Sequence, residues 1–253
     1  MQRYFMQLAY KGTHFHGWQI QPNAKTVQEE LNKAVSVITG EQVNLVGAGR
    51  TDTGVHASFF VAHFDLERPL ADATKFAYQL NGFLGKEIRV DKVFEVEPDM
   101  HARFSALSRT YQYYLSNRKE LFKDEFCAYV PYPLNVEQMN RAAQILFEYT
   151  DFTSFSKLHT DVKTNNCKMM KALWKYENGL LVFEIKADRF LRNMVRAVVG
   201  TLIEVGREKI TIDQFRSIIE NQNRGDAGAS VFAKGLFLTD IEYPDEVNLM
   251  LMR

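Results

Sequence analysis

Apolar residues recur along the 253-residue chain with two different periods. The apolar pattern over residues 2–10 predicts a strand, and the helical period after Thr26 predicts a helix to about Thr39. Thr26 and Glu29 form a T-x-x-E capping box at the start of this helix, and Gly40 follows its last turn. The same criteria predict strands at 43–48 and 57–65, a helix at 72–84 and a strand at 88–96. The resulting order, β-α-β-β-α-β, is typical of a ferredoxin-like unit.

The second part of the chain repeats this order of elements without repeating the sequence. Its predicted elements are a strand at 103–116, a helix from Asn135 to about Phe147, a hairpin of strands 169–176 and 180–186 with Asn178-Gly179 at the turn, helices at 188–205 and 211–220, and a closing strand at 235–243. The chain is therefore predicted to hold two α+β halves, residues 1–102 and 103–253. Side by side, these halves would form a broad sheet with a cleft where they meet.

Charge is balanced over the whole chain, with 31 Lys and Arg against 31 Asp and Glu, while 46% of the residues are apolar. The apolar content excludes a disordered chain. Neutrality argues against a nucleic-acid partner only if the charges are evenly spread. They are not, because residues 101–120 hold four basic residues against one acidic, and residues 156–175 hold five against one. A neutral chain of this kind can carry a basic cleft.

The sequence offers no pattern for a cofactor, a metal ion or a membrane. Cys127 and Cys167 stand forty positions apart, which fits neither a disulfide framework nor a CxxC metal site and favours a reducing compartment. His14 and His16 have no further ligand at metal-site spacing, and no nucleotide-binding glycine loop is present. The first residues lack the pattern of a signal peptide, and no apolar run reaches about 18 residues. We therefore expect a cytoplasmic protein.

The segment GAGRTDTGVHA, residues 47–57, links two predicted strands. Arg50 and Asp52 lie in the same turn, and a neighbouring guanidinium favours the ionised form of a carboxylate. An ionised carboxylate is suited to act as a nucleophile or a base. The alternative is a hairpin loop in which Asp52 only satisfies backbone N–H groups.

Three arginines are predicted to lie on one side of the helix that starts near residue 188. At about 100° per residue, Arg189, Arg192 and Arg196 fall within about 60° of one another, at the margin of an apolar face. Guanidinium groups bind phosphate or carboxylate bidentately. The alternative is a solvated basic face without a ligand.

Cations and aromatic rings are mixed in and around the predicted strand 103–116. Arg103 begins it, and alternation places Arg109, Tyr111 and Tyr113 on one face. Rings that stack on unpaired bases, together with arginines that hold phosphates, are typical of binding to single-stranded RNA. A core strand with a basic rim is the alternative. Lys168 lies in a lysine-rich segment that suits contact with a nucleic-acid backbone, or else is solvated surface.

Several segments together resemble the TruA family of tRNA pseudouridine synthases. The loop GAGRTDTGVHA resembles the family signature AGRTDxGVH. The other matching segments, in chain order, are the Y-x-G-x-x-F-x-G-W-Q-x-Q opening at 10–21, the HARFSA box at 101–106 followed by Tyr111, the DFTSF box at 151–155, the F-x-x-x-M-V-R-x-x-V-G helix from Phe190, and the G-L-x-L strand at 235–238. Matches that keep this order from residue 10 to residue 243 make the resemblance specific.

The resemblance implies an α+β fold, the pseudouridine synthase fold. Its two ferredoxin-like or RRM-like halves form a continuous, mainly antiparallel sheet with helices on one side and a central catalytic cleft. The resemblance also implies an isomerase that converts uridine to pseudouridine at positions 38, 39 and 40 in the anticodon stem-loop of tRNA. It implies no cofactor and no metal, and a homodimer in which one subunit helps to hold the tRNA used by the other.

By the same resemblance, Asp52 is the nucleophile, and Arg50 helps to flip out the target base. Tyr111 stacks on the uracil, Arg196 pairs with Asp52, and Leu236 closes an apolar wall. The predicted RNA contacts are Arg103, Arg109, Lys168, Arg189 and Arg192.

Lys11, Gly85 and Lys168 depart from the family pattern and bear on tRNA docking. Two other hypotheses stay open. A non-catalytic RNA-binding protein would need the basic and aromatic residues but not Asp52. A metal-dependent hydrolase would use His14, His16 and Asp52, and would lose activity with a chelator.

Overall fold

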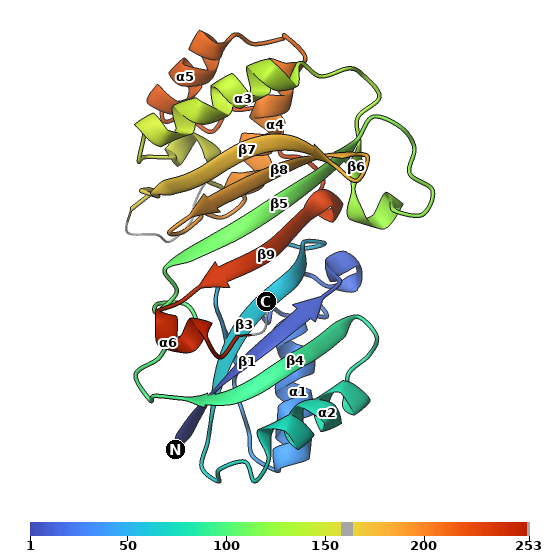
Figure 1. The fold of residues 1–253 in the computed structure, drawn as a ribbon, viewed down its shortest axis with the longest axis vertical. Helices are drawn as coiled ribbons and strands as arrows, with labels where there is room; N and C mark the ends of the chain where they lie inside the picture. The colour runs from blue at the N-terminus through green and yellow to red at the C-terminus, as the bar shows by residue number, and fades with distance from the viewer. Residues whose placement is uncertain (158–163, 252–253) are drawn as a thin grey trace. The chain divides into compact units, whose positions relative to one another are not determined.

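A computed structural model describes residues 1–157 and 164–251 of the chain, drawn from blue to red in Figure 1. The described residues form six α-helices and nine strands, and the strand pairings are mostly antiparallel. The predicted α+β class is therefore confirmed. The chain divides into two compact units, Met1–Ser108 with Leu238–Arg253, and Arg109–Phe237. Strand β9 (Leu236–Glu242) begins in the second unit and ends in the first.

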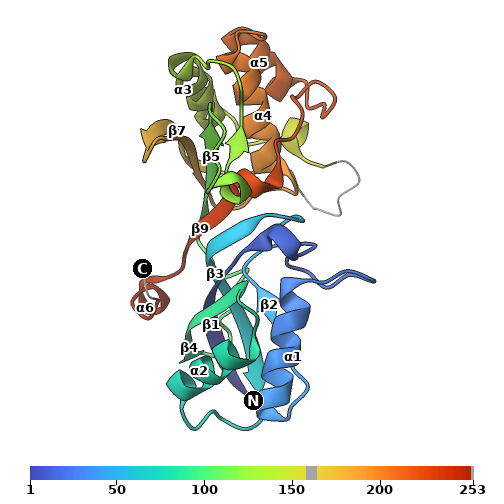
Figure 2. The same ribbon diagram turned by 90° about the vertical axis from the view of Figure 1, so that its right-hand side faces the viewer.

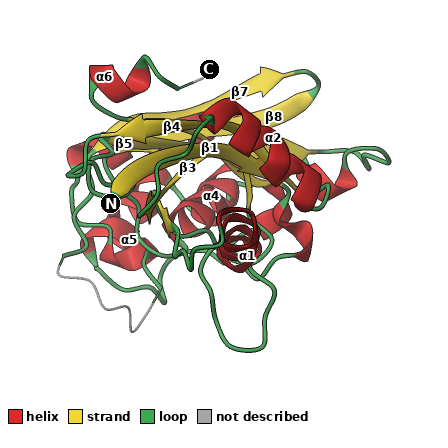
Figure 3. Cartoon of the chain, turned by 90° about the horizontal axis from the view of Figure 1, so that it is seen from below, coloured by secondary structure: helices red, strands yellow, loops and turns green. Residues whose placement is uncertain are grey.

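The first unit has the predicted β-α-β-β-α-β order. Its elements are β1 (Gln2–Tyr10), α1 (Val27–Thr39), β2 (Val46–Gly47), β3 (His56–Leu66), α2 (Ala73–Phe83), β4 (Ile88–Val96) and, from the end of the chain, α6 (Asp245–Asn248). Strand β1 pairs antiparallel with β3 on one side and with β4 on the other. Figure 3 shows α1 and α6 on opposite faces of these strands.

Aromatic side chains fill both faces of this sheet, because alternate residues of β1 point to opposite sides. Tyr4 stacks on Phe64 at 5.6 Å between ring centroids, and Phe64 lies 6.1 Å from Phe76 of α2. Phe5, on the other face, lies 5.4 Å from Tyr243 in the segment between β9 and α6. Both faces of β1 are therefore buried.

Side-chain contacts explain where the predicted elements of this unit are confirmed and where they are not. The Thr26 hydroxyl accepts the Glu29 N–H, as the capping box predicts, and Gly40 ends α1 in the left-handed conformation. Of the predicted strand 43–48, only Val46 and Gly47 form a strand, β2. The residues before them bond to side chains of α1 instead, since Leu45 N donates to Asn32 Oδ1 at 2.9 Å.

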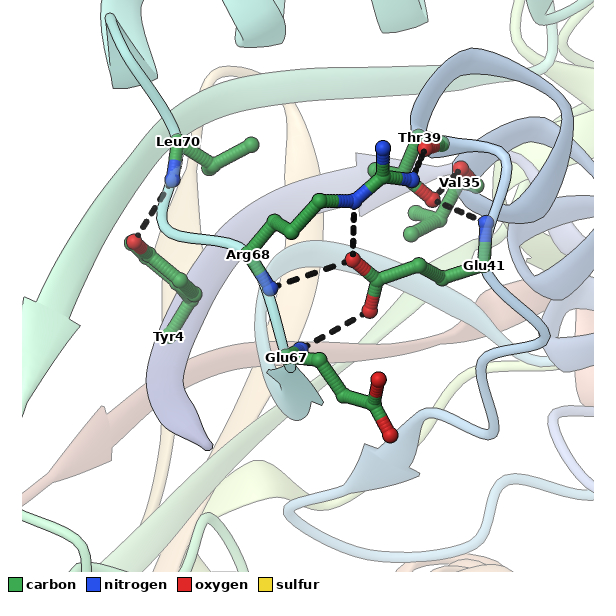
Figure 4. Close-up of polar contacts among 7 residues, drawn as sticks. All are labelled: Tyr4, Val35, Thr39, Glu41, Glu67, Arg68 and Leu70. Atoms are coloured by element: carbon green, nitrogen blue, oxygen red, sulfur yellow. Dashed lines mark hydrogen bonds and ion pairs between the residues drawn. The ribbon is translucent and has the colours of Figure 1, made fainter.

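Figure 4 shows the polar cluster that joins the end of α1 to the loop between β3 and α2. The Glu41 carboxylate accepts hydrogen bonds from Glu67 N at 2.8 Å and from Arg68 N at 3.2 Å. The Arg68 guanidinium donates to the Thr39 carbonyl at 3.0 Å, in the last turn of α1. The backbone bond from Glu67 is the largest cause that lowers the pKa of Glu41. The carboxylate thus fixes a connection that would otherwise expose unpaired N–H groups.

The second unit also places helices against an antiparallel sheet. Its elements are β5 (Ser108–Ser116), β6 (Ala128–Tyr129), α3 (Val136–Ile145), β7 (Met169–Glu177), β8 (Leu180–Ala187), α4 (Met194–Gly206) and α5 (Ile212–Glu220). Strand β8 lies between β5 and β7 and pairs antiparallel with both. Helix α3 packs on α4, α5 and β7, and Figure 2 shows the three helices of this unit close together.

Two predicted boundaries are wrong in the second part of the chain. Strand β5 begins at Ser108 rather than at residue 103, because His101 Nδ1 accepts N–H bonds from Arg103 and Phe104 and folds this segment into a turn. Helix α4 begins at Met194 rather than at residue 188, because Asn193 adopts a left-handed φ of 65° that no helix continues through. Arg189 and Arg192 therefore precede the helix.

Candidate active site

Asp52 lies in the loop between β2 and β3, and the contacts of its neighbours fix this loop. Trp18 N donates to the Thr51 carbonyl at 3.3 Å, and the Thr51 hydroxyl lies 2.8 Å from the hydroxyl of Tyr10. Val55 N donates to the Asp52 carbonyl at 3.1 Å and closes the turn. Asp52 is half-buried and Arg50 is exposed. The loop therefore presents a carboxylate and a cation on a backbone with little freedom to move.

Glycines let the opening segment of the chain approach this loop closely. A Cβ on Gly12 would overlap the Val55 carbonyl, and a Cβ on Gly17 would overlap the Thr51 carbonyl. Gly17 also has a φ of 83°, which favours glycine. The segments Y-x-G-x-x-F-x-G-W and GRTDTGVH therefore form one structural unit around Asp52.

Tyr111 and Arg196 lie in the second unit, on β5 and in the first turn of α4. The Tyr111 ring makes an edge contact with Phe190 at 5.3 Å between centroids. Arg196 Nε donates to the Val231 carbonyl at 2.8 Å, and Val231 N donates back to the Arg196 carbonyl at 3.2 Å. The segment that leads to β9 thus holds the arginine in place.

Leu236 begins β9 and is buried at 4% exposure. The segment before Leu236 packs on Tyr113. The Tyr113 hydroxyl donates to the Phe232 carbonyl at 2.9 Å. The Tyr113 ring lies so close to Gly235 that a Cβ on this glycine would be only 2.9 Å from it. Burial raises the pKa of Tyr113 far above its usual value, and the charge of Arg196 opposes that shift. Tyr113 therefore lies near both Arg196 and the chain that carries Leu236.

Sequence reasoning did not assign a role to Tyr113, Phe190 or Val231. Phe190 stood in the F-x-x-x-M-V-R motif, and Tyr113 shared a predicted face with Tyr111, so both carried a signal. Val231 acts through its backbone, and a pattern of side chains does not report such a contact.

The predicted RNA-binding residues fall in both units. Arg103 lies in the exposed turn of the first unit, with its guanidinium 5.5 Å from the centre of the Phe104 ring. Arg109 starts the second unit on β5, Lys168 directly precedes β7, and Arg189 and Arg192 lie between β8 and α4. The prediction that three arginines lie on one side of a single helix is wrong, since only Arg196 lies in α4. The structure instead joins three of these residues at Asp188, through the main-chain N–H groups of Lys168 and Arg189 and through the guanidinium of Arg109.

Residues 1–157 and 164–251 offer neither a cluster of metal-ligating side chains nor a membrane-spanning helix. Within these ranges no three His, Cys, Asp or Glu side chains gather in a way that could hold a metal ion. His14 Nε2 instead lies 3.5 Å from a carboxylate oxygen of Glu87. None of the helices in the same ranges is long and apolar enough to cross a membrane. Part of the lysine-rich segment 157–175 and His159 lie outside the described residues.

Comparison with known proteins identifies the family. A family model described as tRNA pseudouridine synthase matches residues 7–105 and 142–244. The chain is 55% identical over 248 residues to tRNA pseudouridine synthase A of Bacteroides fragilis, covering 98% of each chain. It is 53% identical over 247 residues to the protein of that name from Parabacteroides distasonis, again covering 98% of each.

A more distant relative supports the same assignment. The tRNA pseudouridine synthase A of Thermoanaerobacter pseudethanolicus is 42% identical over 246 residues, covering 96% of this chain and all of the relative. The family match spans the Asp52 loop and the opening segment that packs on it, and it also spans α4 with Arg196 and the start of β9. The chain therefore belongs to the tRNA pseudouridine synthase family, and it is an isomerase.

Proposed function

We propose that this chain converts uridine to pseudouridine at positions 38, 39 and 40 of the anticodon stem-loop, with Asp52 as the nucleophile. Its family membership supports pseudouridine formation in tRNA. The observation that supports Asp52 as the nucleophile is the geometry of its loop. Two close glycine approaches and the Tyr10–Thr51 contact fix this loop in place. A loop with no catalytic task would not need a carboxylate held on such a constrained backbone.

The reaction breaks the bond from C1′ of the ribose to N1 of uracil and forms a bond from C1′ to C5. C5 then loses its proton, and N1 gains one, so that the product is an isomer of the substrate. The reaction needs no oxidant, reductant or transferred group from outside, which supports an enzyme without a cofactor. The uridine must leave the base stack before its glycosidic bond can be reached. Arg50, exposed beside Asp52, is the residue proposed to help with this step.

The second unit supplies the remaining proposed roles. Tyr111, with its ring held by Phe190, stacks on the extruded uracil and helps to move a proton. Arg196 is the residue proposed to pair with Asp52. Leu236 closes an apolar wall that excludes water from the detached sugar. The proposed enzyme is a cytoplasmic homodimer, and Arg103, Arg109, Lys168, Arg189 and Arg192 contact the tRNA backbone.

The variant Asp52→Asn tests the nucleophile. It keeps the size of the side chain and removes the charge, so we expect tRNA binding within about twofold of wild type and loss of pseudouridine formation by a factor of at least about 10⁴. Release of tritium from C5-labelled uridine in tRNA measures the reaction. Asp213→Asn, on the exposed side of α5, is the matched control and should react at the wild-type rate. Wild-type turnover by Asp52→Asn would refute the assignment.

A further inference from the structure

The neighbouring strands β5, β8 and β7 of the second unit meet in register at Ala187, the last residue of β8. Ala187 is in register with Arg109 of β5 on one side and with Met169 of β7 on the other. Residues just beyond these positions therefore meet, although they are far apart in the sequence. Asp188 follows Ala187 at the centre of this end.

Asp188 makes a hydrogen bond to each of three basic residues. One oxygen of its carboxylate accepts the N–H groups of Lys168 and Arg189, both at 2.7 Å. Its main-chain carbonyl accepts a bond from the Arg109 guanidinium at 2.8 Å, and its own N–H donates to the Lys168 carbonyl at 3.2 Å. Asp188 therefore fixes the main chain at Lys168 and Arg189, and it holds the guanidinium of Arg109, which is 79 positions away in the chain.

The same contacts fix the connection that follows β8. Arg189 N is bound by the Asp188 carboxylate, and the next residue, Phe190, places its ring against Tyr111. Further along, the Arg192 carbonyl accepts a bond from Lys157 N at 3.0 Å. The segment between β8 and α4 is therefore an ordered loop, and the direction of its side chains depends on how it leaves Asp188.

We propose that Asp188 is a positioning residue that assembles Arg109, Lys168 and Arg189 into one binding site for a phosphodiester group of the RNA. The proposal rests on the proposed function, because it deepens the contact with the tRNA backbone. Guanidinium and ammonium groups together suit a phosphate. The Arg109 guanidinium and the main chain that carries Lys168 and Arg189 are already held in place, so less entropy is lost on binding. The negative charge of Asp188 is compatible with such a site, since two N–H donors already engage its carboxylate.

Substitution of Asp188 separates hydrogen bonding from charge. Asp188→Ala removes the acceptor for two N–H groups, so we expect the Kd and the KM for tRNA to rise about tenfold or more, with a smaller change in kcat. Asp188→Asn keeps an oxygen in the same place, so both constants should stay within about threefold of wild type. Thr211→Ala, which removes the capping hydroxyl of α5 in the same unit, is the control for stability. It should melt at a lower temperature and bind tRNA like wild type.

A double-mutant cycle tests whether the cations act as one site. Arg189→Ala should weaken tRNA binding about tenfold in the wild-type background and less than about threefold when Asp188 is already Ala. Wild-type affinity of Asp188→Ala, additive losses in the cycle, or an Asp188→Asn variant as weak as Asp188→Ala would overturn the proposal. A wild-type protein that forms no pseudouridine would instead refute the proposed function, so the two failures are distinguishable.

Discussion

Contacts of neighbouring residues fix the positions of Asp52 and Arg196. Thr51 is held by Trp18 and Tyr10, while Arg196 exchanges two hydrogen bonds with Val231. A misplacement of about 1 Å at a reacting group can cost roughly a hundredfold in rate. If the proposed roles hold, we therefore expect residues that make these contacts to affect the rate without touching the uridine.

Tyr113→Phe is the residue-scale test of this dependence. The change removes one hydroxyl and leaves the Phe232 carbonyl without its donor. We expect the free energy of unfolding to fall by about 1–3 kcal/mol, and kcat to fall several-fold with little change in the KM for tRNA. Urea unfolding and steady-state tritium release measure the two effects.

Tyr114→Phe is the control for that experiment, because Tyr114 is the next residue on β5 and points to the opposite face. Its hydroxyl bonds to the side chain of Gln112, and its ring contacts Phe237. Its loss should leave kcat within about twofold of wild type. Equal losses of kcat in Tyr113→Phe and Tyr114→Phe would contradict a positioning role for Tyr113.

The sequence was informative about side chains with their own motif and uninformative about residues that act through the backbone. Arg50 and Asp52 were singled out because their loop is rich in glycine and charge, and the resemblance to a family supplied their predicted roles. Tyr113 and Asp188 received no role, because each bonds a main-chain group that is distant in sequence. Such partners are set by strand register, which the order of residues does not reveal.

Local signals predicted the elements of the first unit well. A capping threonine and a left-handed glycine bound α1, and the nearly continuous apolar sequence of β1 matches its burial on both faces. The start of α4 could not be predicted in this way. The apolar period continues through residues 188–193, but a left-handed Asn193 and the bonds of Asp188 break the helix there.

Gly17→Ala tests the contact between the opening segment and the Asp52 loop at the scale of elements. The methyl group would overlap the Thr51 carbonyl, and the φ of 83° is unfavourable for alanine. We expect a loss of at least about 2 kcal/mol in the free energy of unfolding. We also expect kcat at 20 °C to fall more than tenfold, because the loop carrying Asp52 must shift. Thermal denaturation and tritium release measure the changes.

Gly82→Ala is the matched glycine control. No atom lies within 4 Å of the Cβ it would add, and Gly82 stands in the last turn of α2. The variant should be about 0.5–1 kcal/mol more stable than wild type, since alanine favours helix over glycine, and its kcat should be unchanged. A Gly17→Ala enzyme with wild-type kcat would show that the Asp52 loop does not depend on this contact.

For the whole molecule, residues with proposed roles occur in each of the two compact units. Asp52 and Arg50 belong to the first, and Tyr111, Arg196 and Leu236 belong to the second. The net charge of zero conceals an uneven distribution, since the basic residues Arg109, Lys168 and Arg189 all bond to Asp188 at one end of the sheet in the second unit. A neutral chain can thus offer phosphate-binding groups where the proposed function needs them.

The most direct test is to map pseudouridine in tRNA from cells that encode this chain, with its gene intact and with it deleted. We predict that uridines 38, 39 and 40 stay unmodified after deletion, while pseudouridines elsewhere in the same tRNAs remain. Expression of the wild-type chain should restore the three positions, and expression of Asp52→Asn should not. Pseudouridine that persists at all three positions in the deleted cells would contradict the proposed function.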